Sequence, residues 1–105
     1  MKIEYKEGLI VLKDQDEEVG YIKYVRKEEN VIDVISTVVH EKYQGQGMAG
    51  KLFDALMDYA KDNSMKIIPS CSYIEKKLMK IPNSCDFLHK KKKKVYYTQK
   101  INIYA

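Results

Sequence analysis

The first forty residues alternate short apolar runs with turn-forming residues, and this pattern predicts β-strands. The apolar runs cover residues 3–5, 9–12, 19–25 and 31–39. Glycine or polar residues separate them at position 8 and at positions 14–16 and 27–30. Because these connections are short, we expect an antiparallel meander. Residues 31–39 are apolar enough to form a central strand of the sheet.

The spacing of apolar positions becomes helical after residue 47. One face of the predicted helix carries Met48, Leu52, Ala55, Leu56, Tyr59 and Ala60. A helix of this length can cross over the sheet and deliver residues 66–70 as a strand parallel to residues 31–39. The sequence therefore predicts an α/β domain with a mixed sheet, in which antiparallel strands lead into a parallel pair.

A second helix is predicted directly after the parallel pair. Ser72 and Glu75 have the spacing of a capping box, in which the serine caps the helix and the glutamate reaches back to it. The apolar stripe of this helix consists of Ile74, Leu78 and Ile81. Pro82 is expected to end the helix. Residues 95–103 alternate weakly and predict one extra C-terminal strand.

A glycine-rich segment, residues 44–50, joins the central strand to the first helix. A turn that opens a helix presents unpaired backbone N–H groups and the positive end of the helix dipole. Such a turn binds a phosphate or pyrophosphate, and Gly45 and Gly47 let the backbone approach the ligand closely. An ordinary glycine-containing loop without a ligand is the alternative interpretation.

The spacing Gly45-x-Gly47-x-x-Gly50 also matches the fingerprint of dinucleotide-binding folds. In that fold the first glycine ends the strand directly, whereas five residues separate Val39 from Gly45 here. An acidic residue should also follow the next strand to bind a ribose, and no carboxylate occurs there before Glu75. We therefore do not expect a nicotinamide or flavin dinucleotide.

Residues 39–49 instead resemble the acetyl-CoA signature of the GNAT superfamily of N-acetyltransferases. That signature is a strand valine, a short polar loop and Gln/Arg-x-x-Gly-x-Gly/Ala at a helix start. Gln44, Gly47 and Ala49 occupy its three defining positions. A second segment, Ile-Ile-Pro-Ser-Cys-Ser-Tyr at residues 67–73, resembles a small GNAT-like subfamily with Cys-Ser/Trp-Tyr/Phe after the next strand. The resemblance covers about residues 3–82.

This resemblance implies that acetyl-CoA or coenzyme A is the co-substrate and that the acetyl group goes to a small-molecule or protein amine. The residues implied in holding the pyrophosphate are Gln44, Gly45, Gln46, Gly47, Met48, Ala49 and Gly50. Pantetheine would lie along Thr37, Val38 and Val39, and the amide of Val38 or Val39 would polarise the thioester oxygen. A non-catalytic acyl-CoA-binding or regulatory module is the alternative function. An interaction protein that uses its basic segment is a more remote one.

Cys71 and Tyr73 are the candidate catalytic residues. Cys71 lies beside the predicted helix start, where the dipole favours a thiolate, and the resemblance implies a place next to the acetyl group. It would act there as a covalent relay or line the pocket. Tyr73 would give a proton to the departing CoA thiolate. A buried structural thiol and a packing tyrosine are the alternatives.

The sequence assigns no general base. Members of the resembled subfamily often carry His-Thr-Glu-Val where residues 36–39 of this chain read Ser-Thr-Val-Val. The imidazole and the carboxylate of that motif are therefore missing. His40 and Glu41 are close in sequence, but they flank the phosphate loop. The histidines and cysteines have no recognised metal-ligand spacing, so no metal site is predicted.

Composition and charge limit the remaining possibilities. A length of 105 residues fits one domain over residues 1–105, with a basic loop and the extra strand after residue 82. Five lysines at residues 90–94 account for the net charge of +4, since the remainder carries about −1. We expect this lysine run to be a solvated loop or to steer anionic CoA.

Other partners are not indicated by the sequence. No nucleic-acid-binding module is recognisable, so nucleic acid is not an expected partner. The chain shows no membrane-spanning segment and no signal peptide, and its two cysteines form no disulfide framework. We therefore expect a cytoplasmic monomer or homodimer.

Overall fold

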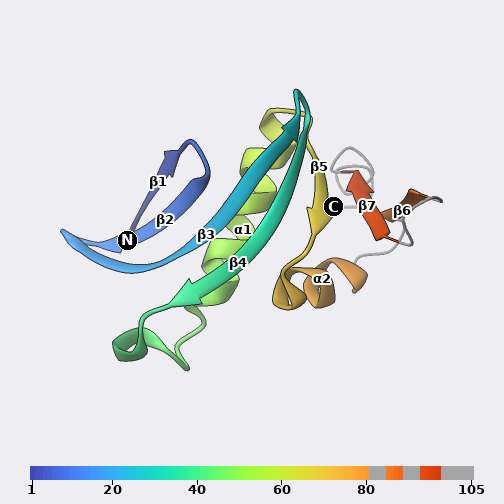
Figure 1. The fold of residues 1–105 in the computed structure, drawn as a ribbon. Coiled ribbons are helices and arrows are strands. Elements are labelled where there is room, and N and C mark those ends of the chain that lie inside the picture. The colour runs from blue at the N-terminus through green and yellow to red at the C-terminus, as the bar shows by residue number, and fades with distance from the viewer. Residues whose placement is uncertain (81–84, 89–92, 98–105) are drawn as a thin grey trace.

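The computed structural model describes residues 1–80, 85–88 and 93–97. Within them a seven-stranded sheet has the order β1-β2-β3-β4-β5-β7-β6 (Figure 1). The strands are β1 (Lys2–Lys6), β2 (Leu9–Asp14), β3 (Glu17–Glu28), β4 (Val31–Val39), β5 (Lys66–Pro69), β6 (Cys85–Leu88) and β7 (Lys93–Tyr97). The helices are the 3₁₀ turn η1 (Glu41–Tyr43), α1 (Met48–Asp62) and α2 (Ser72–Met79).

The predicted order of antiparallel and parallel strands is confirmed. Strands β1 to β4 form an antiparallel meander in chain order. The crossover through α1 then brings β5 parallel to β4, with Val31 opposite Lys66 and Val34 opposite Pro69. The fold class is therefore the mixed α/β arrangement that the sequence predicts.

The C-terminal part differs from the prediction. Strand β7 begins at Lys93, so Lys93 and Lys94 belong to a strand and not to a solvated loop. It pairs antiparallel with β5, and β6, which the sequence did not predict, pairs with β7. Residues 90–92 and 98–103 of the predicted loop and strand lie outside the described residues.

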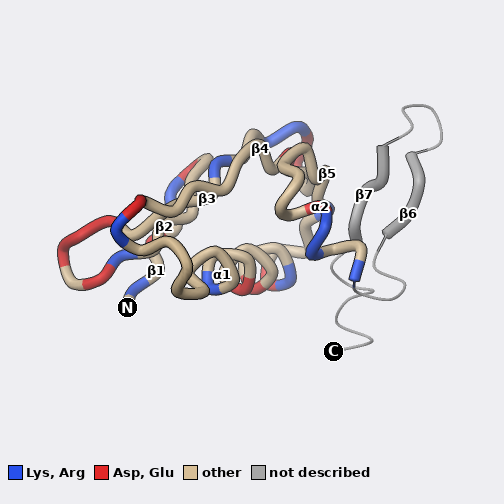
Figure 2. Tube along the Cα trace, turned by 90° about the horizontal axis from the view of Figure 1, so that it is seen from below, with Lys and Arg blue, Asp and Glu red and all other residues tan. Residues whose placement is uncertain are grey.

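Helix α1 covers one face of the sheet, and the core lies between them (Figures 1 and 2). Strand and helix positions contribute fully buried side chains, among them Ile10, Ile22, Ile32, Val34, Leu52, Leu56, Ile67, Ile74 and Leu78. Burying each such side chain contributes about 1.5–3 kcal/mol. The predicted apolar face of α1 is buried except at Tyr59, which is partly buried and packs against the cluster.

The predicted capping box at Ser72 is wrong. Cys71 is the N-cap of α2, with extended backbone angles of φ −80° and ψ 123°, and no side chain caps the helix. The Cys71 N–H donates to the carbonyl of Val34 at 2.9 Å, which fixes the start of the helix against β4. Ser72 is therefore already the first helical residue. Ile81 and Pro82, the predicted helix end, lie outside the described residues, and α2 ends at Met79.

Gly20 on β3 allows the end of β4 to lie close to it. It is paired with Val39, and a Cβ at this position would lie 2.3 Å from the carbonyl oxygen of Val38. The same Cβ would lie 3.3 Å from Cδ1 of Leu52 on α1. Any side chain here would therefore displace the carboxyl end of β4 from the first half of α1.

We expect Gly20→Ala to destabilise the domain and Gly50→Ala to stabilise it. Overpacking against backbone typically costs about 1–3 kcal/mol, and Gly20 has no flexible neighbour that can relieve the 2.3 Å contact. Gly50 lies in α1 with nothing within 4 Å of a built Cβ, so alanine should add about 0.5–1 kcal/mol. Urea unfolding of both variants measures these changes. Equal stability of Gly20→Ala and the parent would contradict the close approach.

Candidate functional site

Strands β4 and β5 separate halfway along β4 (Figure 1). Strand β5 pairs with residues 31–34 of β4, and the chain then leaves the sheet to begin α2. Among the described residues, 35–39 have no strand partner on that side, while β3 pairs with their other side. An opening therefore forms at the carboxyl ends of two parallel strands, the usual ligand position in open α/β sheets.

A β-bulge at Ile35 changes the direction of β4 at this point. Val34 pairs with Tyr24 and Ser36 pairs with Lys23, which leaves Ile35 as the additional residue on β4. Beyond the bulge, Thr37 lies opposite the fully buried Ile22, on the face of the sheet that α1 covers. The bulge thus aims Thr37 at the space between the two helix starts.

The glycine-rich turn has the geometry predicted for an anion-binding site. Gly45 and Gly47 have φ values of +76° and +79°, in the left-handed region that favours glycine, and Gly47 is the N-cap of α1. A Cβ built at Gly45, Gly47 or Gly50 would meet nothing within 4 Å. The first amides of α1 therefore begin a helix beside open space, where a phosphate can accept their hydrogen bonds.

A pocket of about 380 Å³ brings most of the predicted site residues together. Its lining residues are Thr37, Val39, Tyr43, Gln44, Gly45, Gly47, Met48, Ala49, Gly50 and Tyr73. Two predicted ligand-binding residues are not part of this wall. Val38 pairs with Tyr21 and so lies on the opposite face of the sheet from Thr37, and Gln46 donates through Nε2 to the carbonyl of Lys42 at 3.2 Å.

The two candidate catalytic residues lie at the α2 side of this pocket. Tyr73 lines it directly, and burial, together with the charges of Asp54 and Cys71, raises the pKa of the Tyr73 hydroxyl. Tyr73 therefore keeps its proton at neutral pH. Cys71 is buried in the core behind the pocket wall, with Sγ 3.5 Å from Oγ1 of Thr37.

Asp33 is a residue that the sequence reasoning missed. Among the described residues it is the one buried residue of acidic or basic type, with 8% of its surface exposed. Its Oδ1 is buried and has no hydrogen-bond partner within the described part of the chain. A carboxylate oxygen in this state is costly and calls for an explanation. In the sequence, Asp33 could have been recognised as an acidic residue among the apolar residues at the start of the central strand.

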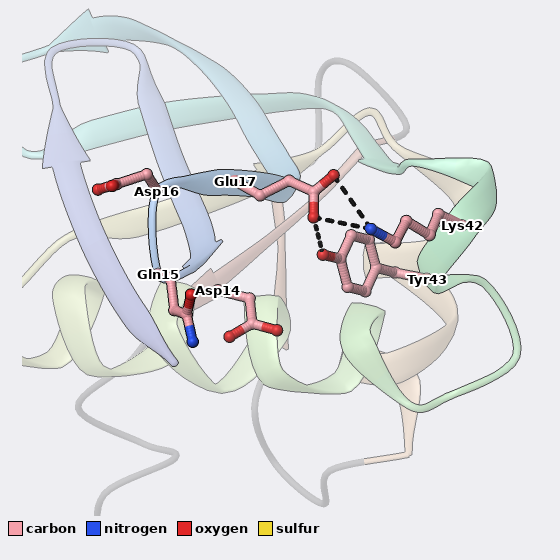
Figure 3. A pocket seen from close by; sticks show the side chains of 6 residues that line it. All are labelled: Asp14, Gln15, Asp16, Glu17, Lys42 and Tyr43. Carbon is pink, nitrogen blue, oxygen red and sulfur yellow. Dashed lines mark hydrogen bonds and ion pairs between the residues drawn. The ribbon is translucent and has the colours of Figure 1, made fainter.

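The turn before the glycine-rich segment is held by the start of β3 (Figure 3). Lys42 forms an ion pair with Glu17 at 3.0 Å, and the Tyr43 hydroxyl donates to the same carboxylate. The hydrogen bonds from Tyr43 and Lys42 lower the pKa of Glu17. The Glu17 carboxylate in turn raises the pKa of both partners. Tyr43, which the sequence did not single out, lines the pocket at α1. It also lines a second pocket, shown in Figure 3, together with Asp14, Gln15, Asp16, Glu17 and Lys42.

The described part of the chain contains neither a metal-ligand cluster nor a membrane-spanning helix. No group of three or more His, Cys, Asp or Glu side chains lies close enough there to hold a metal ion. None of the helices among these residues is both long and apolar enough to span a membrane. His40 forms a hydrogen bond with the Glu18 carboxylate at 2.7 Å and lies beside the glycine-rich turn, as its sequence position suggests.

Comparison with known families identifies the class of protein. Residues 9–88 match the model of the GCN5-related N-acetyltransferase family, and the chain belongs to this family. Family membership confirms the predicted acetyl-CoA-dependent N-acetyltransferase, with acetyl-CoA as co-substrate.

Solved structures show the same fold. A GCN5-like protein from Staphylococcus aureus, described as a candidate N-acetyltransferase, is 31% identical, with a TM-score of 0.59 over 75% of this chain and 78% of that chain. The N-acetyltransferase YhbS from Escherichia coli, in complex with CoA, is 16% identical, with a TM-score of 0.58 over 90% and 61% of the two chains. The Y144F mutant of the toxin AtaT, bound to the antitoxin AtaR and acetyl-CoA, is 13% identical, with a TM-score of 0.58 over 91% and 70%.

Proposed function

We propose that this chain binds acetyl-CoA in the pocket at the N-terminus of α1 and transfers the acetyl group to an amine at the opening between β4 and β5. The observation that carries this proposal is the pocket that joins the glycine-rich turn to Thr37 and Tyr73. The CoA and acetyl-CoA complexes of YhbS and AtaT support it, because both proteins have this fold.

The pyrophosphate binds to the amides of residues 45–50 in this proposal, because the Gln44 N–H already donates to the carbonyl of Glu41 at 3.2 Å. The open space in front of Gly45 and Gly47 admits the phosphates, and the N-terminal end of α1 stabilises their charge. Pantetheine extends from there along the unpaired side of β4 at Thr37 and Val39. The Cys-Ser-Tyr segment at residues 71–73 then lies at the acyl end, as in the small single-domain subfamily that the sequence resembles.

Acetyl transfer from a thioester requires mainly placement and two proton transfers. Holding the amine against the thioester lowers the barrier by about 7–11 kcal/mol. An amine with a pKa near 10.4 must first lose a proton, which costs about 4–5 kcal/mol at pH 7. The nitrogen then attacks the carbonyl carbon, the C–S bond breaks, and the CoA thiolate takes a proton from its donor. The second proton of the nitrogen leaves as the amide forms and restores that donor. Tyr73, protonated and lining the pocket, is the proposed donor to that thiolate.

Asp33 is the proposed general base. Its neighbours Ile32 and Val34 are fully buried under α1, so strand alternation directs Asp33 to the other face of the sheet. Val25, paired with Asp33 on that face, is 43% exposed. In this proposal the amine approaches the opening from this face and gives its proton to the Asp33 carboxylate through a water molecule, because Asp33 is only 8% exposed and lies in the part of β4 that pairs with β5.

We consider two alternative roles for Cys71, which differ in whether its sulfur forms a bond with the acetyl group. As a relay, its thiolate would attack the thioester, release CoA and hold the acetyl group until the amine attacks in turn. As part of the pocket, it would support Thr37 at 3.5 Å while the amine attacks acetyl-CoA directly. The acceptor in either case is a small-molecule or protein amine, and we retain the expectation of a cytoplasmic monomer or homodimer.

A non-catalytic acyl-CoA-binding module is the second candidate function. It is favoured by Ser36 and Val38, which stand where the resembled subfamily carries a histidine and a glutamate. Such a module would bind CoA in the same pocket without turnover.

We expect CoA and acetyl-CoA, but not NAD, to stabilise the domain in a thermal-shift titration. A ligand present at about 100 times its dissociation constant adds about 2.7 kcal/mol. Gly47→Asp should abolish this effect because it places a carboxylate where a phosphate binds. Gly47→Asn is the matched control: it has the same size and tolerates the positive φ, so the difference between the two variants measures the charge. Stabilisation by NAD alone would contradict the proposal.

We expect Asp33→Asn to lower kcat about 10²- to 10⁴-fold, the usual contribution of a general base. CoA affinity should not change, because Asp33 is not part of the CoA pocket wall. The variant should remain folded, since asparagine has nearly the same size and shape as aspartate. Asp58→Asn, at an exposed position of α1, controls for charge alone. An unchanged kcat in Asp33→Asn would exclude Asp33 as the base.

We expect bound acetyl-CoA to protect Cys71 from iodoacetamide. A Cys85→Ser background leaves Cys71 as the single thiol, so mass spectrometry reports its labelling without ambiguity. Cys71→Ser should lose nearly all turnover if Cys71 is a relay, and only a modest part if the amine attacks acetyl-CoA directly. Labelling that saturating CoA does not change would place the thiol away from the acyl end.

A further inference from the structure

Residues 40–43, which connect β4 to the phosphate-binding turn, are attached to the first three residues of β3. The His40 N–H donates to the carbonyl of Val19 at 2.9 Å, and its imidazole contacts the Glu18 carboxylate at 2.7 Å. Lys42 and Tyr43 both reach Glu17. Three of the four connecting residues are therefore held by one end of one strand.

Figure 3 shows Glu17 pointing from the start of β3 toward Lys42 and Tyr43, away from its neighbour Asp16. The ion pair with Lys42 is solvent-exposed, and exposed pairs of this kind contribute little to stability. The hydroxyl of Tyr43 is the stronger anchor, because its ring is only 8% exposed and packs in the core. Glu17 thus fixes the residue that immediately precedes Gln44.

The phosphate-binding turn itself has few attachments. Gln44 donates through Nε2 to the carbonyl of Val39 at 2.9 Å, and Gln46 donates to the carbonyl of Lys42 at 3.2 Å. Gly45 and Gly47 have open space around them and positive φ values, which glycine can leave at low cost. The direction of the amides at residues 44–50 therefore depends on how well residues 40–43 are held.

We infer that Glu17 is a positioning residue for CoA: by holding Tyr43 and Lys42, it keeps the phosphate-binding turn in the conformation that receives the pyrophosphate. This inference rests on the proposed function. A turn that is already ordered in the free protein loses less conformational entropy when CoA binds. The affinity for CoA is therefore higher. Without the contacts of Glu17, a smaller fraction of the molecules has the turn in the conformation that binds CoA. The apparent affinity for CoA falls by that fraction.

Removal of Glu17 has opposite effects on CoA affinity, depending on whether its contacts or its negative charge matter more. The β2–β3 turn carries Asp14, Asp16, Glu17 and Glu18, visible as the red segment in Figure 2, beside a site for an anionic ligand. Removing any one of these charges should strengthen CoA binding if the charge alone matters. Removing Glu17 should weaken binding if its contacts with Tyr43 and Lys42 matter more.

The test compares Glu17→Ala with Asp16→Ala in the full chain. Both variants remove one carboxylate from the same turn, but Asp16 makes none of the contacts that hold residues 40–43. We expect Glu17→Ala to raise the dissociation constant for CoA about three- to ten-fold, while Asp16→Ala leaves it equal or lower. Tyr43→Phe, which keeps the ring and removes the hydroxyl, should weaken binding in the same direction. Circular dichroism confirms that each variant is folded.

Hydrogen exchange of the Tyr43 and Gln44 amides, which donate to the carbonyls of His40 and Glu41 at 2.8 and 3.2 Å, provides a readout that needs no ligand. Exchange in the free protein should be about three- to ten-fold faster in Glu17→Ala than in the parent, and unchanged in Asp16→Ala. Equal exchange in Glu17→Ala and the parent would overturn the positioning role, whether or not CoA binds. A parent that fails to bind CoA would overturn the proposed function instead. Tighter CoA binding by Glu17→Ala would show that its charge, and not its contacts, governs the site.

Discussion

The separation of β4 from β5 after Val34 is the constraint on which the site depends. Parallel pairing ends at Pro69, which has no N–H to continue a ladder, and the hydrogen bond from Cys71 to the Val34 carbonyl closes the pair. The candidate site lies at this point. The free side of β4 faces the pocket, α2 starts beside it with Tyr73, and the bulge at Ile35 turns Thr37 toward both. If the two strands paired over the whole of β4, the pocket could not exist.

The least favourable features of the fold gather around the same opening. Asp33 carries a buried oxygen without a partner, Gly45 and Gly47 add flexibility at the helix start, and α2 begins without a side-chain cap. Each feature lowers stability, and the core beneath α1 offsets them. Ile32 and Val34, which flank Asp33 in sequence, are fully buried in that core. Strand alternation thus lets one segment of β4 stabilise the fold on one face and present a carboxylate on the other.

The sequence predicted the elements whose signals are local and periodic. The meander, α1 and the parallel strand follow from apolar spacing and short turns, and the turn before α1 follows from its glycines. Interactions between distant segments set the rest. The start of α2 shifts to Cys71 because of a hydrogen bond to Val34, thirty-seven positions away, and not because of the local Ser72–Glu75 spacing. Asp33 looked like one polar residue in a strand, since its burial depends on the assembled sheet. Strand β6 could not be recognised because the segment before the lysine run is short and its apolar and polar residues alternate only weakly.

We infer that the contact between Glu17 and Tyr43 keeps the glycine-rich turn ordered without burying it. The turn must stay open to admit a ligand, so it cannot be packed into the core. Tyr43 attaches the residues before the turn to the rest of the domain. Its ring packs in the core, and its hydroxyl donates to the carboxylate of Glu17 at the surface. The acidic turn at β2–β3 then has a structural reason to lie beside an anion-binding site, where its charge alone would be unfavourable. An acidic residue beside an anion-binding site is therefore a sign that its contacts with neighbouring residues matter more for binding than its charge.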